Sequence, residues 1–246
     1  ELSEANRRLE AATKQLVMSE KLAAIGEITA GVAHEINNPI AVIQGNLEVL
    51  RNALGEKARE SETEFRLIDE QTERMRLIVS KLLQFAKPDE YSGSQEYSAP
   101  SEVFSDCLPL VRHLMKKNEI DVERNQQSTG TVGMGRTELQ QVLVNLIVNA
   151  VHAMPEGGIL SLACENSIHG DAHGIAITVR DTGTGMSPEV ASRIFDPFYT
   201  TKRGTGTGLG LSITHMLVTN AGGSIAVETA PGKGTAFRIW LPEYSA

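Results

Sequence analysis

The sequence predicts an α+β protein in which a helical hairpin precedes a separate domain of mixed helices and strands. Three observations support this prediction. Apolar residues recur every three or four positions through residues 1–86, which is the period of a helix that packs along one side. The polar stretch DEYSGSQEYS then interrupts the pattern at residues 89–98. Beyond it, helical patterns alternate with segments of two-residue period, which is typical of strands.

The first 88 residues predict a long helix, a turn and a second helix. Residues 1–22 follow a narrow heptad seam, which predicts a coiled coil. The helical rhythm continues to Leu50, NALGEKARES interrupts it, and a second run extends from Phe65 to Ala86. Because two helices with one apolar stripe each cannot close a core, we expect residues 23–88 to form a homodimeric four-helix bundle.

Residues 99–246 predict the second domain, which follows a linker at residues 89–98. Its expected elements are, in order, a helix over SEVFSDCLPLVRHLMKK despite Pro109, a strand over EIDVERN, a helix over RTELQQVLVNLIVNAVHAM, the strands GILSLACEN and GIAITVRD around a polar loop, a helix from Gly208 to Asn220, and the strands Ser224–Thr229 and Thr235–Leu241.

Composition narrows the function classes. The chain has 246 residues, 41% of them apolar, and a formal net charge of −8. This charge argues against nucleic acid or an anionic membrane as partners. The chain begins at Glu1, without Met and without a signal peptide, so we expect a part of a longer, cytoplasmic protein or the cytoplasmic part of a membrane-anchored sensor. Cys107 and Cys164 form no metal-binding or redox pair, so we expect packed thiols.

The stretch GVAHEINNPI places polar chemistry inside a predicted helix. At 100° per residue, His34 lies almost opposite the isoleucine and leucine seam, and Asn38 follows one turn later. Glu35 can hold one imidazole nitrogen protonated and leave the other as a nucleophile. Pro39 removes a backbone hydrogen bond and is expected to bend this turn. From spacing alone, a reactive histidine and an ordinary surface histidine stay equally open.

The helix at residues 136–154 carries an unusual polar face. Asn145, Asn149 and His152 gather there with Glu138 and Gln141, away from the leucine face. Asparagine is a mediocre helix former, and charged residues normally cover solvated faces. Neutral amide oxygens suit a Mg²⁺ ion that keeps waters and phosphates among its ligands.

Two glycine-rich stretches follow. In VRDTGTGM, Asp181 ends a strand beside Gly183 and Gly185, where a carboxylate can accept from an exocyclic amine of a flat ring; a plain turn is the alternative. In FDPFYTTKRGTGTGLGL, Lys202 precedes glycines that lead into a helix. The N-terminus of that helix is expected to bind phosphates. The spacing fits neither the P-loop nor the dinucleotide fingerprint.

Together these motifs resemble the sensor histidine kinases of two-component signalling over essentially the whole chain. HEINNPI is similar to the phosphoacceptor box, NLIVNAVHAM to the asparagine box, DTGTGM and GTGLGL to the two glycine boxes, FDPFYTTK to the phenylalanine box, and PGKGTAFRIWLP to a common ending of the catalytic domain. The HEINNP spelling and the short TTK lid resemble the nitrogen-sensor-like branch.

The resemblance implies a Bergerat-type α/β sandwich that binds ATP, attached to a dimeric hairpin and preceded by a signalling coiled coil. It implies that His34 attacks the γ-phosphate, that Glu35 is the general base, and that the phosphoryl group passes to an aspartate of a response regulator. Asn38 matches the position that relatives use to orient water when they dephosphorylate that regulator.

The resemblance also implies the nucleotide contacts. Asn145 and Asn149 would hold Mg²⁺, His152 would touch the phosphates, and Asp181 would bind the adenine amine. The remaining implied nucleotide contacts are Gly183, Gly185, Lys202, Gly206, Gly208, Gly210 and Thr235.

Two rival interpretations compete with this one. The chaperone, topoisomerase and mismatch-repair ATPases share the Bergerat fold but need no histidine on a dimer helix. A catalytically silent dimeric scaffold that binds ATP would be expected to lack a nucleotide-box residue, and none is missing. His169 and His173 flank Asp171 in IHGDAHG, which we expect to be a solvated hairpin loop and not a metal site.

Overall fold

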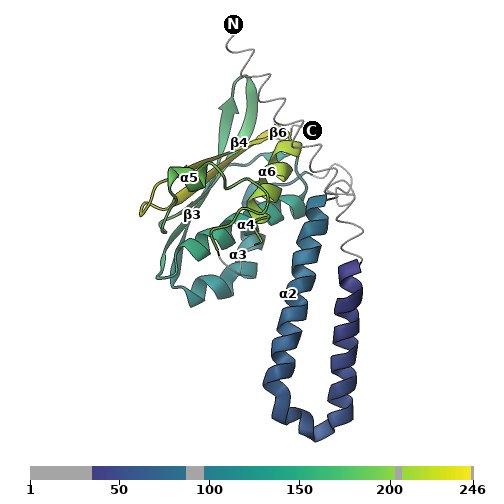
Figure 1. The fold of residues 1–246 in the computed structure, drawn as a ribbon. Helices are drawn as coiled ribbons and strands as arrows, with labels where there is room; N and C mark the ends of the chain where they lie inside the picture. The colour runs from purple at the N-terminus through teal and green to yellow at the C-terminus, as the bar shows by residue number, and fades with distance from the viewer. Residues whose placement is uncertain (1–34, 87–96, 203–206, 245–246) are drawn as a thin grey trace. The chain divides into compact units, whose positions relative to one another are not determined.

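The computed structural model describes residues 35–86, 97–202 and 207–244, which belong to two compact units, Glu1–Tyr91 and Ser92–Ala246 (Figure 1). Each unit is described by itself. Within the described ranges, no helix combines the length and the apolar character needed to cross a bilayer.

The first unit is the predicted helical hairpin. A helix occupies residues 35–54 and continues through Pro39, the 3₁₀ helix η1 (Gly55–Ser61) makes the turn, and α2 (Glu62–Ala86) returns (Figure 1). Leu47, Ala58 and Phe65 form a small buried cluster at this turn. The hairpin therefore has a local core at its closed end.

Much of the apolar surface of the hairpin is exposed within one chain. Ile40 and Leu47 are buried, but Ile43 and Leu50 of the expected seam are 40% and 51% exposed. Further exposed apolar side chains are Val42, Val49, Leu54, Leu67, Ile68 and Met75. An exposed apolar surface of this kind marks an interaction site. A second helical pair is the kind of partner that would bury it.

The second unit is an α/β sandwich. Its sheet contains β1 (Ile120–Gln126), β2 (Thr131–Val132), β3 (Gly158–His169), β4 (Ala172–Asp181), β5 (Ser224–Thr229) and β6 (Thr235–Tyr244). The strand order is β1-β3-β4-β6, with β2 and β5 both paired to β6. Only β1 and β3 pair in parallel; the other pairs are antiparallel.

Three longer helices pack on one face of this sheet: α3 (Pro100–Lys117), α4 (Arg136–Ala153) and α6 (Gly210–Asn220) (Figure 1). The short α5 (Pro188–Ala191) follows β4. The core between helices and sheet is mainly aliphatic. Its fully buried members include Leu139, Leu143, Leu146 and Ile147 of α4 and Leu160, Leu162, Ile175 and Ile177 of the sheet. The leucine face predicted for α4 is therefore its core face.

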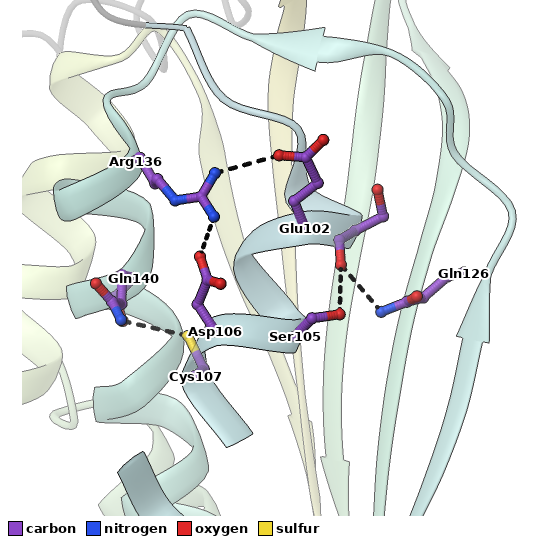
Figure 2. Close-up of polar contacts among 8 residues, drawn as sticks. Glu102, Ser105, Asp106, Cys107, Gln126, Arg136 and Gln140 are labelled. Carbon is purple, nitrogen blue, oxygen red and sulfur yellow. Dashed lines mark hydrogen bonds and ion pairs between the residues drawn. The ribbon is translucent and has the colours of Figure 1, made fainter. Parts of the chain in front are cut away.

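A polar network crosses from α3 to α4 at the surface. Figure 2 shows Arg136, the first residue of α4, donating to the carboxylates of Glu102 and Asp106. These side chains are largely exposed, so the ion pairs contribute little to stability compared with the apolar contacts beneath them. Below the network, the Cys107 thiol approaches the Gln140 carbonyl oxygen at 3.8 Å. Pro109 lies inside α3 and not in its first turn.

One expectation for this unit needs correction, and two short elements were not expected. The segment IHGDAHG is not a loop, because β3 extends to His169 and β4 begins at Ala172, which leaves residues 170 and 171 as the turn. Ten residue pairs join the two strands, so the strands extend beyond the predicted segments GILSLACEN and GIAITVRD. Among the described residues, no group of three His, Cys, Asp or Glu side chains is placed to hold a metal ion. The short elements β2 and α5 were not predicted.

The end of the expected linker belongs to the second unit. Ser98 exchanges backbone hydrogen bonds with Val132 and donates its hydroxyl to the Met134 carbonyl oxygen at 2.7 Å. The ring of Tyr97 stacks on that of Tyr244 with 3.5 Å between centroids. These contacts attach the chain to β2 and to the C-terminal end of β6 before α3 begins.

Both cysteines are buried free thiols. Burial, helped by the nearby charge of Asp106, raises the pKa of Cys107 to about 12. Burial also raises the pKa of Cys164, against a lowering by two backbone N–H donors. Since the thiolate is the reactive form, we expect the native protein to resist a thiol reagent such as DTNB at pH 8 and both thiols to react after unfolding in guanidinium chloride. Rapid reaction of either thiol in the native state would contradict this burial.

Candidate functional site

The site is built on the polar face of α4. Asn145 and Asn149 are half-buried and His152 is exposed near the C-terminal end of the helix, while the opposite face enters the core. The side-chain amide of Asn145 donates to the Gly210 carbonyl oxygen at 3.4 Å. Gly210 is the first residue of α6. The polar face of α4 therefore lies beside the N-terminus of α6.

Lys202 lies against this face. Its ammonium is 3.4 Å from Asn149 Oδ1 and 3.1 Å from His152 Nδ1. Although His152 is exposed, partial burial of its ring, and then the charge of Lys202, lower the pKa of His152. Burial lowers the pKa of Lys202. At neutral pH these shifts favour a neutral imidazole that accepts from the lysine. The sequence predicted a lysine near phosphates but not its contact with these two side chains.

Asp181 occupies the end of β4 and is only 4% exposed. Its Oδ1 accepts from the backbone N–H of Gly183 at 2.8 Å and of Thr235 at 3.2 Å. Burial raises the pKa of Asp181, whereas these two N–H donors lower it. Within the described chain, Oδ2 accepts no hydrogen bond, so it is available to a ligand. A buried carboxylate with one committed and one available oxygen fits the predicted amine acceptor.

The glycines next to Asp181 allow a close approach of backbone segments. A side chain at Gly183 would overlap the end of α4 at Ala153, whose carbonyl oxygen accepts from the Thr184 N–H at 3.0 Å. Gly185 has φ +63° and its α-carbon faces the Ala230 carbonyl oxygen. These contacts tie the turn after β4 to α4 on one side and to the turn between β5 and β6 on the other.

Gly208 closes the segment that carries Lys202. It has φ +69°, and a side chain there would overlap the backbone of Phe198. The Phe198 N–H donates to the Gly208 carbonyl oxygen at 3.1 Å, although Phe198 itself has φ +64°, which is uncommon for a bulky residue. Residues 198 and 208 are therefore held together through their backbones. Gly206 lies outside the described residues.

Three predicted site residues belong to the first unit of the chain. His34 lies outside the described residues. Glu35 and Asn38 are exposed on the helix at 35–54 and belong to the first unit. The exposure of Asn38 agrees with its predicted place away from the buried side of the helix.

Sequence reasoning missed Thr229, the last residue of β5. Its hydroxyl contacts Met186, Gly234 and Thr235 around the Asp181 end of the site. The strand predictions contained the signal, because pairing Ser224–Thr229 with Thr235–Leu241 through a five-residue turn places Thr229 opposite Thr235. That register was not drawn from the sequence.

The donor set fits a magnesium nucleotide. Asn145 and Asn149 supply neutral amide oxygens, which suit an ion that takes its other ligands from water and phosphates. The Lys202 ammonium already lies against Asn149 Oδ1, so this position attracts positive charge. A Mg²⁺ ion held at the same oxygen would displace the Lys202 ammonium from it.

Two family models match the chain. Residues 24–90 match the His Kinase A (phospho-acceptor) domain. Residues 134–245 match the histidine kinase-, DNA gyrase B- and HSP90-like ATPase domain. The phosphoacceptor match in the first unit decides against the chaperone, topoisomerase and mismatch-repair ATPases, which need no histidine on a dimer helix. The chain belongs to the sensor histidine kinases of two-component systems.

Curated relatives agree with this membership. The histidine kinase is 36% identical to sporulation kinase A of Bacillus subtilis, over 94% of this chain and 37% of the relative. It is 36% identical to the C4-dicarboxylate transport sensor protein DctB of Rhizobium meliloti, over 95% of this chain and 37% of the relative. Sensor histidine kinase ZraS of Escherichia coli is 33% identical, over 93% of this chain and 48% of the relative. The chain thus spans less than half the length of these relatives. Membership of the nitrogen-sensor-like branch stays a prediction.

Solved structures support the fold. Full-length ShkA, crystallised with AMPPNP, matches with a TM-score of 0.73 and 24% identity over 89% of this chain and 46% of that one. The catalytic domain of histidine kinase ThkA matches with a TM-score of 0.54 and 29% identity over 61% of this chain and 97% of that one. The helical hairpin followed by a Bergerat-type domain is therefore confirmed for this histidine kinase.

Proposed function

We propose that this histidine kinase phosphorylates itself on His34 with ATP and Mg²⁺, then transfers the phosphoryl group to an aspartate of a response regulator. The observation that carries the proposal is the two-ended site of the second unit. Asp181 offers a buried acceptor at one end, and the asparagine face of α4 meets Lys202 and the N-terminus of α6 at the other.

The two ends suit the two parts of ATP. Asp181 Oδ2 accepts an N–H of the adenine amine, and Gly183 and Gly185 let the backbone approach the ring. The phosphates then lie at the other end, where the proposed contacts are His152, Lys202, Gly206, Gly208, Gly210 and the first N–H groups of α6. Asn145 and Asn149 would hold the Mg²⁺ ion, which would neutralise phosphate charge when bound.

The proposed phosphoryl transfer to His34 forms one bond and breaks another. The unprotonated imidazole nitrogen forms a bond to the γ-phosphorus while the bond between that phosphorus and the bridging oxygen breaks, and ADP leaves with the electron pair. Glu35, the next residue along the chain and exposed, accepts the proton from the other imidazole nitrogen. Transfer to the regulator breaks the N–P bond, forms a carboxyl–phosphate bond and regenerates the imidazole.

The helical hairpin is the part of the chain that is expected to bind both protein partners, a second copy of the chain and the response regulator. Its exposed apolar side chains, such as Val49 and Leu50, suit a homodimeric four-helix bundle. The response regulator is expected to dock on the same bundle, where the exposed Asn38 can orient a water against the phosphorylated aspartate and give phosphatase activity toward the regulator. A catalytically silent ATP-binding scaffold is the alternative function.

The test is incubation of the purified chain with γ-labelled ATP and Mg²⁺. We expect label that survives alkali and is lost in acid, as for a phosphoramidate, and a fall to background in His34→Gln. His113→Gln, which changes an exposed histidine on α3, is the matched control and should label normally. Label that persists in His34→Gln would exclude His34 as the acceptor. Unlabelled protein that still binds ATP would favour the scaffold.

A further inference from the structure

The hydroxyl of Thr229 is the meeting point of three hydrogen bonds behind the Asp181 end of the site. Thr229 Oγ1 lies 2.9 Å from the Met186 backbone nitrogen, 3.0 Å from the Gly234 carbonyl oxygen and 3.1 Å from Thr235 Oγ1. Met186 follows the glycine turn after β4, and Gly234 precedes β6. One side chain thus connects the two backbone segments that surround Asp181.

Only one assignment of protons satisfies all three hydrogen bonds. The Met186 N–H can only donate, and the Gly234 carbonyl can only accept. A hydroxyl has one proton, so Thr229 donates its proton to the Gly234 carbonyl oxygen. Thr235 must then be the donor in the bond between the two threonines. This assignment commits the Thr235 proton to Thr229 and leaves the lone pairs of Thr235 Oγ1 for other partners.

The register of the sheet places Thr235 beside the amine acceptor. Thr229 is opposite Thr235 in the β5–β6 pair, and Thr235 is opposite Asp181 in the β4–β6 pair. Residues directly opposite in an antiparallel pair point to the same face of the sheet. The three side chains therefore form one row, in which the two members nearest the base, Thr235 and Asp181, both present acceptors.

We propose that Thr229 is a positioning residue that, by holding the Thr235 proton, makes this site select a purine with an exocyclic amine over a 6-oxo purine. The inference rests on the proposed nucleotide-binding function and extends it to base specificity. A row of acceptors pairs with the N–H groups of the 6-amine of adenine. The 6-oxygen of hypoxanthine is itself an acceptor, so it meets the Asp181 carboxylate and the lone pairs of the Thr235 hydroxyl, and neither offers it a proton. A site built to pair one polar group discriminates against an analogue that lacks it.

The competing explanation is that Thr229 only joins two turns. Loss of its hydroxyl would then weaken binding of every nucleotide equally. Base selectivity separates the two explanations, because only the proposed role predicts a change in the ratio of affinities.

The experiment measures the affinity of the purified chain for ADP and for inosine diphosphate by calorimetry with Mg²⁺. The wild type should prefer ADP. Thr229→Val releases the Thr235 proton, so the preference should fall roughly tenfold, about the effect of one hydrogen bond. Thr229→Ser keeps the hydroxyl and should keep the preference. Thr219→Val, which removes a hydroxyl bonded to the His215 carbonyl oxygen within α6, is the matched control and should leave the preference unchanged.

Each outcome is informative. An equal loss of affinity for both nucleotides in Thr229→Val, or an unchanged preference, overturns the inference while the proposed function stands. A wild type that binds neither nucleotide overturns the proposed function itself. Should Thr229→Val fail to fold, Thr229→Cys replaces it, because a thiol is a weaker hydrogen-bonding group of similar size. The preference of this variant for ADP should be weaker than that of the wild type and of Thr229→Ser, but should not be lost.

A double-mutant cycle tests the route of the effect. If Thr229 acts through Thr235, the change in ADP preference caused by Thr229→Val should disappear in a Thr235→Val background. An undiminished effect in that background would show that Thr229 does not act through the Thr235 proton.

Discussion

Asp181→Asn is expected to weaken ADP binding by roughly 100-fold, because a hydrogen bond to a charged acceptor contributes about 1.5–3 kcal/mol and the new amide can also turn a donor toward the adenine amine. The backbone donors hold Oδ1 of Asp181, so an amide oxygen takes the committed position and the NH₂ group takes the place of Oδ2. Calorimetry with ADP and Mg²⁺ measures the loss, and labelling of His34 should fall with it.

The same substitution should leave the folded protein intact. Burial raises the pKa of Asp181 above its ordinary value, so the folded state holds this proton more tightly than the unfolded state. The ionised carboxylate therefore costs stability as the pH rises from the ordinary aspartate range through the raised pKa, and the full cost is present above it. Asparagine has no such cost, so the nucleotide-free variant should melt no lower than the wild type at pH 7.

Thermal melts of both proteins between pH 4 and pH 8 check this sign. The difference in melting temperature should grow in favour of Asp181→Asn as the pH rises. A variant that melts well below the wild type at pH 7 would show that the carboxylate has a structural role, and retained ADP affinity in a folded variant would remove Asp181 from the base site.

The helix-borne part of the site was predictable from sequence because helical period is a local property. The 100° rotation per residue separates Asn145 and Asn149 from the leucines, and the structure buries the leucines and leaves the asparagines at the edge of the core. Asp181 was likewise recognisable as the polar end of an apolar strand followed by glycines. Both inferences use fewer than twenty consecutive residues.

The contacts that depend on distant pairing were not predictable in the same way. Lys202 meets Asn149 and His152, which precede it by 53 and 50 residues, and no local pattern fixes such an approach. The role of Thr229 depends on the β5–β6 register and on Met186, 43 residues earlier. The hairpin turn between β3 and β4 was misjudged because polar residues near a strand end look like a loop when the partner strand is unknown.

Gly185→Ala is the second large effect that we expect, because a side chain there conflicts with fixed backbone. Gly185 has φ +63°, and an added Cβ would overlap the Ala230 carbonyl oxygen and press on Gly234. Backbone cannot move aside as a flexible side chain can. Relief requires the turn after β4 to separate from the turn between β5 and β6, which also displaces the N–H groups that orient Asp181. We expect a loss of roughly 3 kcal/mol in the free energy of unfolding and no measurable ADP binding.

Gly232→Ala is the control that distinguishes the cost of a positive φ from the cost of steric overlap between a Cβ and the backbone. Gly232 has φ +73°, close to the value at Gly185, but nothing lies within 4 Å of the position that a Cβ would take. Alanine there should cost only the left-handed conformation, about 1 kcal/mol, and should leave ADP affinity within roughly twofold of the wild type. Denaturant unfolding and calorimetry on the two variants measure both quantities. Equal destabilisation would mean that φ alone explains the glycine at 185, and that the close approach of the two turns does not hold Asp181 in place.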